Sequence, residues 1–254
     1  MRPSILTAPV NIRSLALFVA ITLPISAAAG IRAEFNTVLT SPAYSYSGVL
    51  AIEGNASRID VLKGSHPLFR ENTSIITRDG GQEIVILDHV RRTWHARRAA
   101  GLGGHLSTSR GIGATTALEP EVHTRRDGRE HRLRVKYGLV MKIEGEKLNG
   151  NVDLEVISEV DPDLHQKALP WGLQFGAKSG FDAIDRVIAR GIPRAIPVRQ
   201  VVTATRQIEG GEPLTETMTT VLTNVANAPT PKEVFFPPRD YTYEVPKFEF
   251  GTGE

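Results

Sequence analysis

The stretch HRLRVKYGLVMKI, residues 131–143, has an apolar residue at every odd position from 133 onward. These residues are Leu133, Val135, Tyr137, Leu139, Met141 and Ile143, whereas Arg132, Arg134 and Lys136 occupy even positions. Such alternation is typical of a β-strand with one buried face and one solvent-exposed face. At about 3.3 Å per residue this strand would span roughly 43 Å, far more than the usual strand of about 5–6 residues. The stretch therefore predicts a barrel or a strongly curved sheet that wraps around a core or a ligand.

Turn motifs on both sides predict that this strand belongs to an antiparallel sheet. The dipeptide DG at 127–128 is a two-residue hairpin turn, which places Thr124 opposite His131 and His123 opposite Arg132. Further turn signals separate other alternating segments, at 54–55, 79–82, 145–150 and 209–212. The order along the chain is therefore many antiparallel strands, a helical insertion and two more strands, with no repeat and no internal domain boundary.

Two segments depart from the strand pattern. Residues 99–116 are rich in Gly, Ser and Thr, which predicts a long flexible loop. After Asp161 the apolar spacing becomes helical, and we expect helices over 163–175 and 180–189. The C-terminus, broken by prolines, is expected to be an extended tail.

The first 29 residues predict an export signal. Arg2 and Arg13 precede the apolar run SLALFVAITLPI, and small residues follow up to Ala29. The run is shorter than the roughly 20 residues that a membrane-spanning helix needs. We expect cleavage after Ala29, with Ala33 as the second choice and an uncleaved anchor as the alternative. The mature chain, 30–254, would then be a single domain without a transmembrane segment.

Positive charge is concentrated in residues 91–136, which hold eleven Lys and Arg residues against four Asp and Glu residues. This surface would suit an anionic membrane or an acidic envelope protein. An ordinary solvated outer face of a hairpin is an equal alternative. No nucleic-acid-binding module accompanies the charge, so nucleic acid is not an expected partner. The arginines assigned to a partner surface are Arg91, Arg92, Arg97, Arg98, Arg125, Arg126 and Arg129.

Motifs for catalysis, metals and cofactors are absent from the sequence. There is no G-x-S-x-G or H-E-x-x-H pattern, and the absence of cysteine removes disulfides, thiol catalysis and cysteine ligands. The histidines lack ligand spacing, and the predicted hairpin register places His123 and His131 on opposite faces. We therefore expect no catalytic residue, no metal site, no cofactor and no enzymatic activity.

Aromatic residues are concentrated where helices are expected. Trp171, Leu173 and Phe175 would either be ordinary core residues or sit on a helical lid that lines a cavity inside the curved sheet. In the second case they would plug or line that cavity, and the inner face of the strand would meet either a ligand or only this lid.

Several segments together resemble the outer-membrane lipoprotein-carrier (LolA/LolB-like) superfamily, and most closely its periplasmic members without an assigned function. The matching segments are YSGVLAIEG at 46–54, SRIDVL at 57–62, TRDGGQEIVILDHVRRTW at 77–94, NGNVDLEVIS at 149–158, GIPRAIPV at 191–198 and FFPPRDYT at 235–242. The resemblance implies a mainly β (α+β) fold, an unclosed antiparallel β-barrel with a helical lid over an apolar concavity. Arg58 is the candidate for an arginine that anchors the lid.

The resemblance implies a periplasmic binding or carrier protein for a lipid, an acylated molecule or another amphipathic ligand. The ligand would lie against Leu133, Val135, Tyr137, Leu139, Met141, Trp171, Leu173 and Phe175. The alternative is an envelope protein-interaction module that uses the basic surface of 91–136 and holds no small molecule.

Overall fold

The computed structural model describes residues 30–40, 43–66, 69–78, 83–98, 112–117, 121–124, 128–143, 146–165, 182–192 and 195–245. Nearly all of them lie in strands. The first half contains β1 (Ile31–Thr40), β2 (Ala43–Glu53), β3 (Ala56–His66), β4 (Phe69–Arg70), β5 (Thr73–Thr77), β6 (Glu83–Asp88) and β7 (Thr93–Arg98). The second half contains β8 (Ile112–Ala117), β9 (Glu121–Thr124), β10 (Glu130–Ile143), β11 (Glu146–His165), α3 (Asp182–Gly191), β12 (Ala195–Ile208), β13 (Leu214–Asn227), η2 (Lys232–Phe235) and β14 (Thr242–Tyr243).

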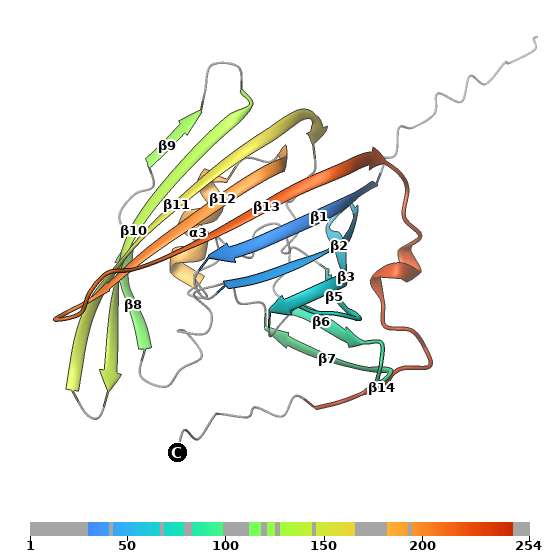
Figure 1. Ribbon diagram of the computed structural model, residues 1–254, viewed down its shortest axis with the longest axis horizontal. Coiled ribbons are helices and arrows are strands. Elements are labelled where there is room, and N and C mark those ends of the chain that lie inside the picture. Colours follow the sequence, from blue (N-terminus) through green and yellow to red (C-terminus); the bar gives the residue numbers. More distant parts are fainter. Residues whose placement is uncertain are drawn as a thin grey trace, which may run out of the picture.

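These strands form a single curved sheet (Figure 1). Its strand order is β14-β7-β6-β5-β3-β2-β1-β13-β12-β11-β10-β8, with β4 beside β3 and β9 beside β10. Among the described strands every pairing is antiparallel except that of β14 with β7. The order ends at β14 on one side and β8 on the other, so the sheet does not close on itself. The predicted fold class is confirmed: a mainly β protein with an unclosed, strongly curved antiparallel sheet and a helix against it.

Side-chain alternation makes one face of the sheet apolar and the other largely polar. In β10, Leu133, Val135 and Leu139 are buried, whereas Arg132 and Arg134 between them are exposed. β1 follows the same rule along its whole length, with each odd position buried and each even position exposed. Successive side chains of a strand point to opposite faces, so these odd positions share one face.

We call this buried side the concave face. It forms one hydrophobic cluster with contributions from β1, β2, β3, β5, β6, β10, β11, β12, β13 and α3. The helix contributes Ile184 and Ile188, one turn apart, and contacts β10 and β8. Full burial of one such side chain is worth about 1.5–3 kcal/mol, so this cluster is the main source of stability.

The hairpins predicted from turn motifs are confirmed. β5 pairs with β6 across 79–82, and β12 pairs with β13 across 209–212. Gly54 adopts a φ of 58° in the turn between β2 and β3, as a short hairpin turn requires. The register of β9 and β10 is the predicted one, with His131 opposite Thr124 and Arg132 opposite His123.

Three sequence predictions were wrong at their boundaries. Residues 112–116 of the loop expected over 99–116 belong to β8, which begins at Ile112 and pairs with β10, while 99–111 lie outside the described residues. The turn expected over 145–150 is shorter, since β10 and β11 pair as far as Ile143 and Glu146. The helix expected from 163 is preceded by strand as far as His165, and residues 166–181 are not described. In each case backbone pairing to a neighbouring strand prevails over local composition.

Gly48 is a position where the sheet tolerates no side chain. A Cβ atom there would lie 1.8 Å from the carbonyl oxygen of Asp60 on the neighbouring strand β3. Replacing Gly48 by Ala should therefore lower the free energy of unfolding by about 1–3 kcal/mol, because the backbone of β2 must move away from β3. Urea-induced unfolding followed by circular dichroism measures this change.

Gly211 provides the matched control. A Cβ atom on Gly211 would lie 3.4 Å from its nearest neighbour, the carbonyl oxygen of Ile208, which is ordinary contact. Gly211→Ala should change the free energy of unfolding by no more than about 0.5 kcal/mol. Equal effects of the two substitutions would contradict the close β2–β3 approach.

Candidate functional site

The predicted ligand-lining residues of β10 lie on the concave face. Leu133, Val135, Tyr137 and Leu139 are buried there, in the same cluster as Ile184 and Ile188 of α3. They contribute to a packed core, and their role in lining a ligand site stays a prediction. Met141 lies in β10 opposite Leu148, but its side chain is outside the described part of the structure. The remaining predicted lining residues, Trp171, Leu173 and Phe175, lie outside the described residues.

The helix that covers part of this face is short and amphipathic. Ile184 and Ile188 of α3 are buried, whereas Arg186 and Arg190 are exposed. Helices of ten residues are marginal on their own, so α3 depends on the packing of its apolar side for stability. Any ligand that competes for the same apolar surface therefore competes with this helix.

The concave face carries charge beside the helix. Arg206 of β12 forms an ion pair with Glu216 of β13, and their side chains are 20 % and 15 % exposed. Burial raises the pKa of Tyr137 to about 12, with Arg206 lowering it and Asp185 of α3 raising it further. Burial also lowers the pKa of Arg206. No sequence signal indicated this pair, although both residues fall at inward-facing positions of their strands.

A second hydrophobic cluster lies on the opposite, convex side of the sheet. It contains Ala51, Ile76, Val85 and Leu87, and Phe235 from η2 packs onto it. The chain from η2 to β14, residues 232–245, thus covers this part of the convex face. We call it the C-terminal segment. The prolines of this segment predicted only an extended tail.

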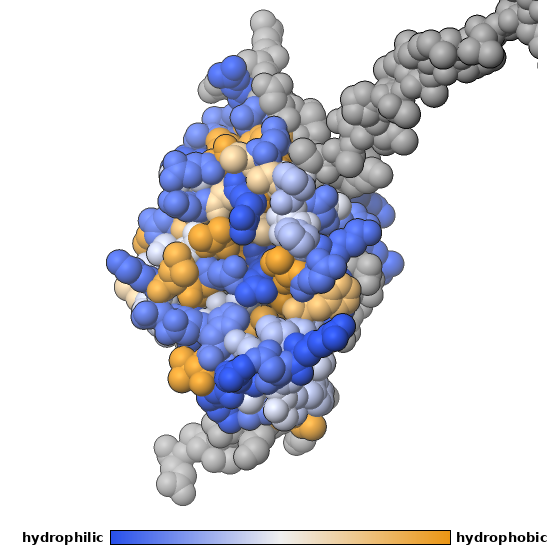
Figure 2. Space-filling model, turned by 90° about the vertical axis from the view of Figure 1, so that its right-hand side faces the viewer, coloured by the Kyte–Doolittle hydropathy of each residue, from blue (hydrophilic) through white to orange (hydrophobic). Residues whose placement is uncertain are grey.

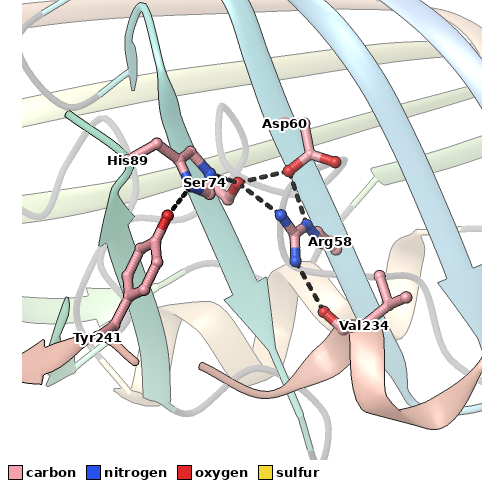
Figure 3. Close-up of polar contacts among 6 residues, drawn as sticks. All are labelled: Arg58, Asp60, Ser74, His89, Val234 and Tyr241. Atoms are coloured by element: carbon pink, nitrogen blue, oxygen red, sulfur yellow. Dashed lines mark hydrogen bonds and ion pairs between the residues drawn. The ribbon is translucent and has the colours of Figure 1, made fainter. Parts of the chain in front are cut away.

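Polar contacts fasten the C-terminal segment to the sheet (Figure 3). Arg58 of β3 donates from Nη1 to the carbonyl oxygen of Val234 at 3.0 Å, and His89 Nδ1 lies 2.7 Å from the hydroxyl of Tyr241. Further along, Arg91 pairs with Glu244 at 2.6 Å, and Arg92 pairs with Asp240. Arg58 therefore anchors the C-terminal segment on the convex face, and its predicted role in anchoring a lid over the concavity was wrong.

Ser74 lies at the centre of these contacts. Its Oγ is 2.5 Å from His89 Nε2 and 3.1 Å from Arg58 Nη2, and it also contacts Asp60 Oδ1. The same Asp60 oxygen accepts from Arg58 Nε at 2.6 Å. We call Arg58, Asp60, Ser74, His89 and Tyr241 the polar clamp.

A serine beside a histidine and an aspartate invites comparison with a catalytic triad, but the donors and acceptors around Ser74 do not fit one. The carboxylate of Asp60 only accepts and the guanidinium of Arg58 only donates, so the Ser74 hydroxyl donates to Asp60 and accepts from Arg58. The second lone pair of Ser74 accepts from Nε2–H of His89, and Nδ1 of the neutral ring accepts from Tyr241. His89 thus holds its proton toward the serine and cannot act as the base that a nucleophilic serine needs.

Burial of Ser74 supports the same conclusion. Its exposed fraction is 0 %, so no substrate reaches its oxygen. Desolvation of the ring lowers the pKa of His89, and the positive charge of Arg58 adds to that effect, outweighing Asp60 and Asp88. In the polar clamp each of the five side chains forms at least one hydrogen bond to another member.

The basic surface predicted for a partner is largely paired with carboxylates where its side chains are described. On β10, Arg134 donates from Nε to Asp153 at 2.9 Å, which lowers the pKa of that carboxyl group. Arg132 and Lys136 also lie within 4 Å of β11 carboxylates. Arg91 and Arg92 pair with the C-terminal segment, and Arg129 is exposed.

The other members of the predicted basic surface are not described at the side-chain level. Arg97 and Arg98 belong to β7, but only their backbone is described. Arg125 and Arg126 lie outside the described residues. Their role in binding a partner stays a prediction.

Neither a metal cluster nor a membrane-spanning helix is found in the described part of the chain. No three His, Asp or Glu side chains there converge on one point. No described helix is long and apolar enough to cross a membrane. Figure 2 shows the molecule from the right-hand side of Figure 1: on the described part of that face, hydrophobic residues form small groups among hydrophilic ones.

Comparisons with known proteins give no family for this chain. No family model matches the sequence, and no curated protein matches it. A solved structure of PNGF-II in space group C2 aligns with a TM-score of 0.34 and 8 % identity, over 85 % of this chain and 31 % of that chain. This chain thus spans less than a third of that protein. At such a low TM-score the match indicates neither a shared fold nor a shared activity.

The hydroxyl of Tyr241 should contribute measurably to stability through the polar clamp. Tyr241→Phe leaves Nδ1 of His89 without its donor, and we expect the free energy of unfolding to fall by about 1 kcal/mol. Tyr243→Phe is the matched control, since that residue is exposed and keeps its ring contact with Trp94. Urea titration of both variants tests this, and equal stabilities would show that the bond to His89 is not formed.

Stability should also depend on pH through His89. Its pKa in the folded protein is lowered, so the unfolded chain takes up the proton first as the pH falls. The contribution of neutral His89 to the free energy of unfolding is present in full above pH about 6.5. This contribution is lost as the pH falls from there through the lower pKa of the folded state. His89→Gln keeps a donor and an acceptor without titrating, so wild type should lose more unfolding free energy than this variant between pH 7.5 and 5.5. Parallel losses would rule out His89 as the source.

Proposed function

We propose that this chain is a periplasmic binding or carrier protein for a lipid, an acylated molecule or another amphipathic ligand. The ligand would lie against the concave face of the half-barrel, as the resemblance to lipoprotein carriers suggests. The observation that supports this proposal is the concave face itself, one apolar surface that runs from β6 to β10. Within the described residues a single short helix, α3, packs against it.

Energetics support an exchange between the helix and an acyl chain. Displacing Ile184 and Ile188 from the concave face costs about 1.5–3 kcal/mol for each side chain. An acyl chain gains about 0.8 kcal/mol for each buried CH₂ group, so ten such groups give roughly 8 kcal/mol. A chain of about ten carbons or more therefore offsets the loss of the helix contacts.

The position of β1 bears on the proposed export. Ile31 and Ala33 pair with β2 opposite Ile52 and Leu50, and both are buried. Cleavage after Ala29 would leave β1 whole, whereas cleavage after Ala33 would remove its first three residues. The structure therefore favours Ala29 of the two proposed cleavage sites.

The alternative, a protein-interaction module on the basic surface of 91–136, receives less support. Carboxylates of β11 and of the C-terminal segment neutralise part of that charge, so an acidic partner would have to compete with them. We also propose that the chain is not an enzyme, since the Ser74–His89 pair is committed to the polar clamp.

Acyl binding is tested on the mature chain, 30–254, by native mass spectrometry and by uptake of a fluorescent fatty acid. We expect a co-purified lipid or saturable uptake. Ile184→Ala should raise the affinity for the fatty acid several-fold, because a weakened helix competes less for the apolar face.

Ala189→Ser is the control for the helix variant, since Ala189 is exposed on the other side of α3. It should leave the affinity unchanged. Absence of any co-purified lipid, together with absence of fatty-acid uptake by wild type and by Ile184→Ala, would refute the carrier proposal.

A further inference from the structure

A row of polar side chains crosses the apolar concave face. The strand registers place Ser158 of β11 opposite Gln200 of β12, Gln200 opposite Thr220 of β13, Thr220 opposite Thr37 of β1, and Thr37 opposite Tyr46 of β2. Five neighbouring strands thus each contribute one polar residue at the same level. We call these five residues the polar row.

The polar row points to the inside of the half-barrel. Thr37 alternates with exposed neighbours in β1 and shares its face with Phe35 and Leu39 of the core cluster. Gln200 lies two residues before Val202, another member of that cluster. Four members of the row are deeply buried: Thr37 and Ser158 are 1 % exposed, Gln200 is 3 % and Tyr46 is 4 %. A solvent-facing role is therefore excluded for these four.

Hydrogen bonds within the row leave one acceptor without a partner. The hydroxyls of Thr37 and Thr220 are 2.9 Å apart, and Nε2 of Gln200 donates to Ser158 Oγ at 3.3 Å. The other amide atom, Gln200 Oε1, is buried and accepts no hydrogen bond within the described structure. An unpaired buried acceptor is unfavourable, so a ligand that supplies a donor to it binds more tightly.

The chemistry of the row defines the donor. None of its five members is an acid or a base that is charged at neutral pH, and burial raises the pKa of Tyr46 above its ordinary value. These five residues offer no counter-ion to a charged head group. His131 of β10 lies opposite Ser158, at the end of the row farthest from Tyr46. An uncharged N–H or O–H group next to an acyl chain fits both the unpaired oxygen and the apolar residues on either side.

We propose that the polar row is the subsite for the polar linkage of an amphipathic ligand, and that Gln200 selects acyl amides or hydroxyacyl groups over simple esters. This inference rests on the proposed acyl-binding function and specifies its ligand class. The acyl chain lies along the apolar part of the concave face, and its N–H or O–H donates to Gln200 Oε1.

A matched pair of probes tests the inference: N-methyldecanamide and methyl decanoate. They share the acyl chain and carbonyl group and differ by an N–H in place of an ester oxygen. In a purely apolar cavity the ester binds better, because an unpaired amide is costly to remove from water. We expect the reverse for this protein, with the amide about five- to tenfold tighter in competition against a bound fluorescent fatty acid.

Substitutions in β12 assign the preference to one residue. Gln200→Met keeps the side-chain length and removes the acceptor, so it should abolish the preference for the amide while the ester binds as before. Gln207→Met is the matched control, because Gln207 is exposed in the same strand, and it should retain the wild-type preference. Thermal unfolding of Gln200→Met checks its fold.

The outcomes separate this inference from the carrier proposal. If the fluorescent fatty acid binds but wild type prefers the ester or binds both probes equally, the subsite is refuted and acyl binding stands. Retention of the amide preference by Gln200→Met also refutes the role of Gln200. If neither the fatty acid nor either probe binds, the carrier proposal itself fails.

Discussion

A curved sheet that does not close has to bury its apolar inner face by other means, and this requirement governs the rest of the molecule. The concave face is continuous across the central strands, so no part of it can be exposed without losing contacts of its neighbours. α3 meets the requirement with two isoleucines, and its exposed side is basic. Among the described residues, α3 is the one helix that packs on this face.

On the convex side, the C-terminal segment covers a local apolar cluster and pairs with the edge strand β7. β14 pairs with β7 through Thr242 N–H to the Arg92 carbonyl at 3.0 Å, so the edge of β7 is already occupied. Unpaired edge strands invite association with other chains, and this parallel addition removes one of them. The polar clamp holds the same segment in place through hydrogen bonds of Arg58 and His89. Such a network fixes the position of the segment because its buried polar groups have partners.

Alternation along each strand made most of the sheet predictable, and long-range pairing accounts for what was missed. The long strand β10 and the hairpins of β5–β6 and β12–β13 were visible because turn and strand signals are local. β1 alternates perfectly, yet it follows directly on the predicted export signal and its partner β13 is far away in sequence. The polar clamp joins four segments that are separate in the sequence, β3, β5, the turn after β6 and the C-terminal segment, so no local motif indicates it. Gln200 is visible in the sequence as a polar residue among the inward-facing valines of β12. Its neighbours in the polar row come from four other strands, so the row itself could not be predicted.

The pairing of β1 with β13 also determines when folding can finish. Thr37 and Thr220, which face each other across this pair, are 183 residues apart in the sequence. β1 is the first described strand to be synthesised, and one of its edges stays unpaired until β13 has been made. Topologies with such distant contacts fold slowly, because a long loop must close before the contacts form. If the predicted export signal directs the chain through a narrow channel, this topology would keep it incompletely folded, and so able to pass, until nearly all of it has been made.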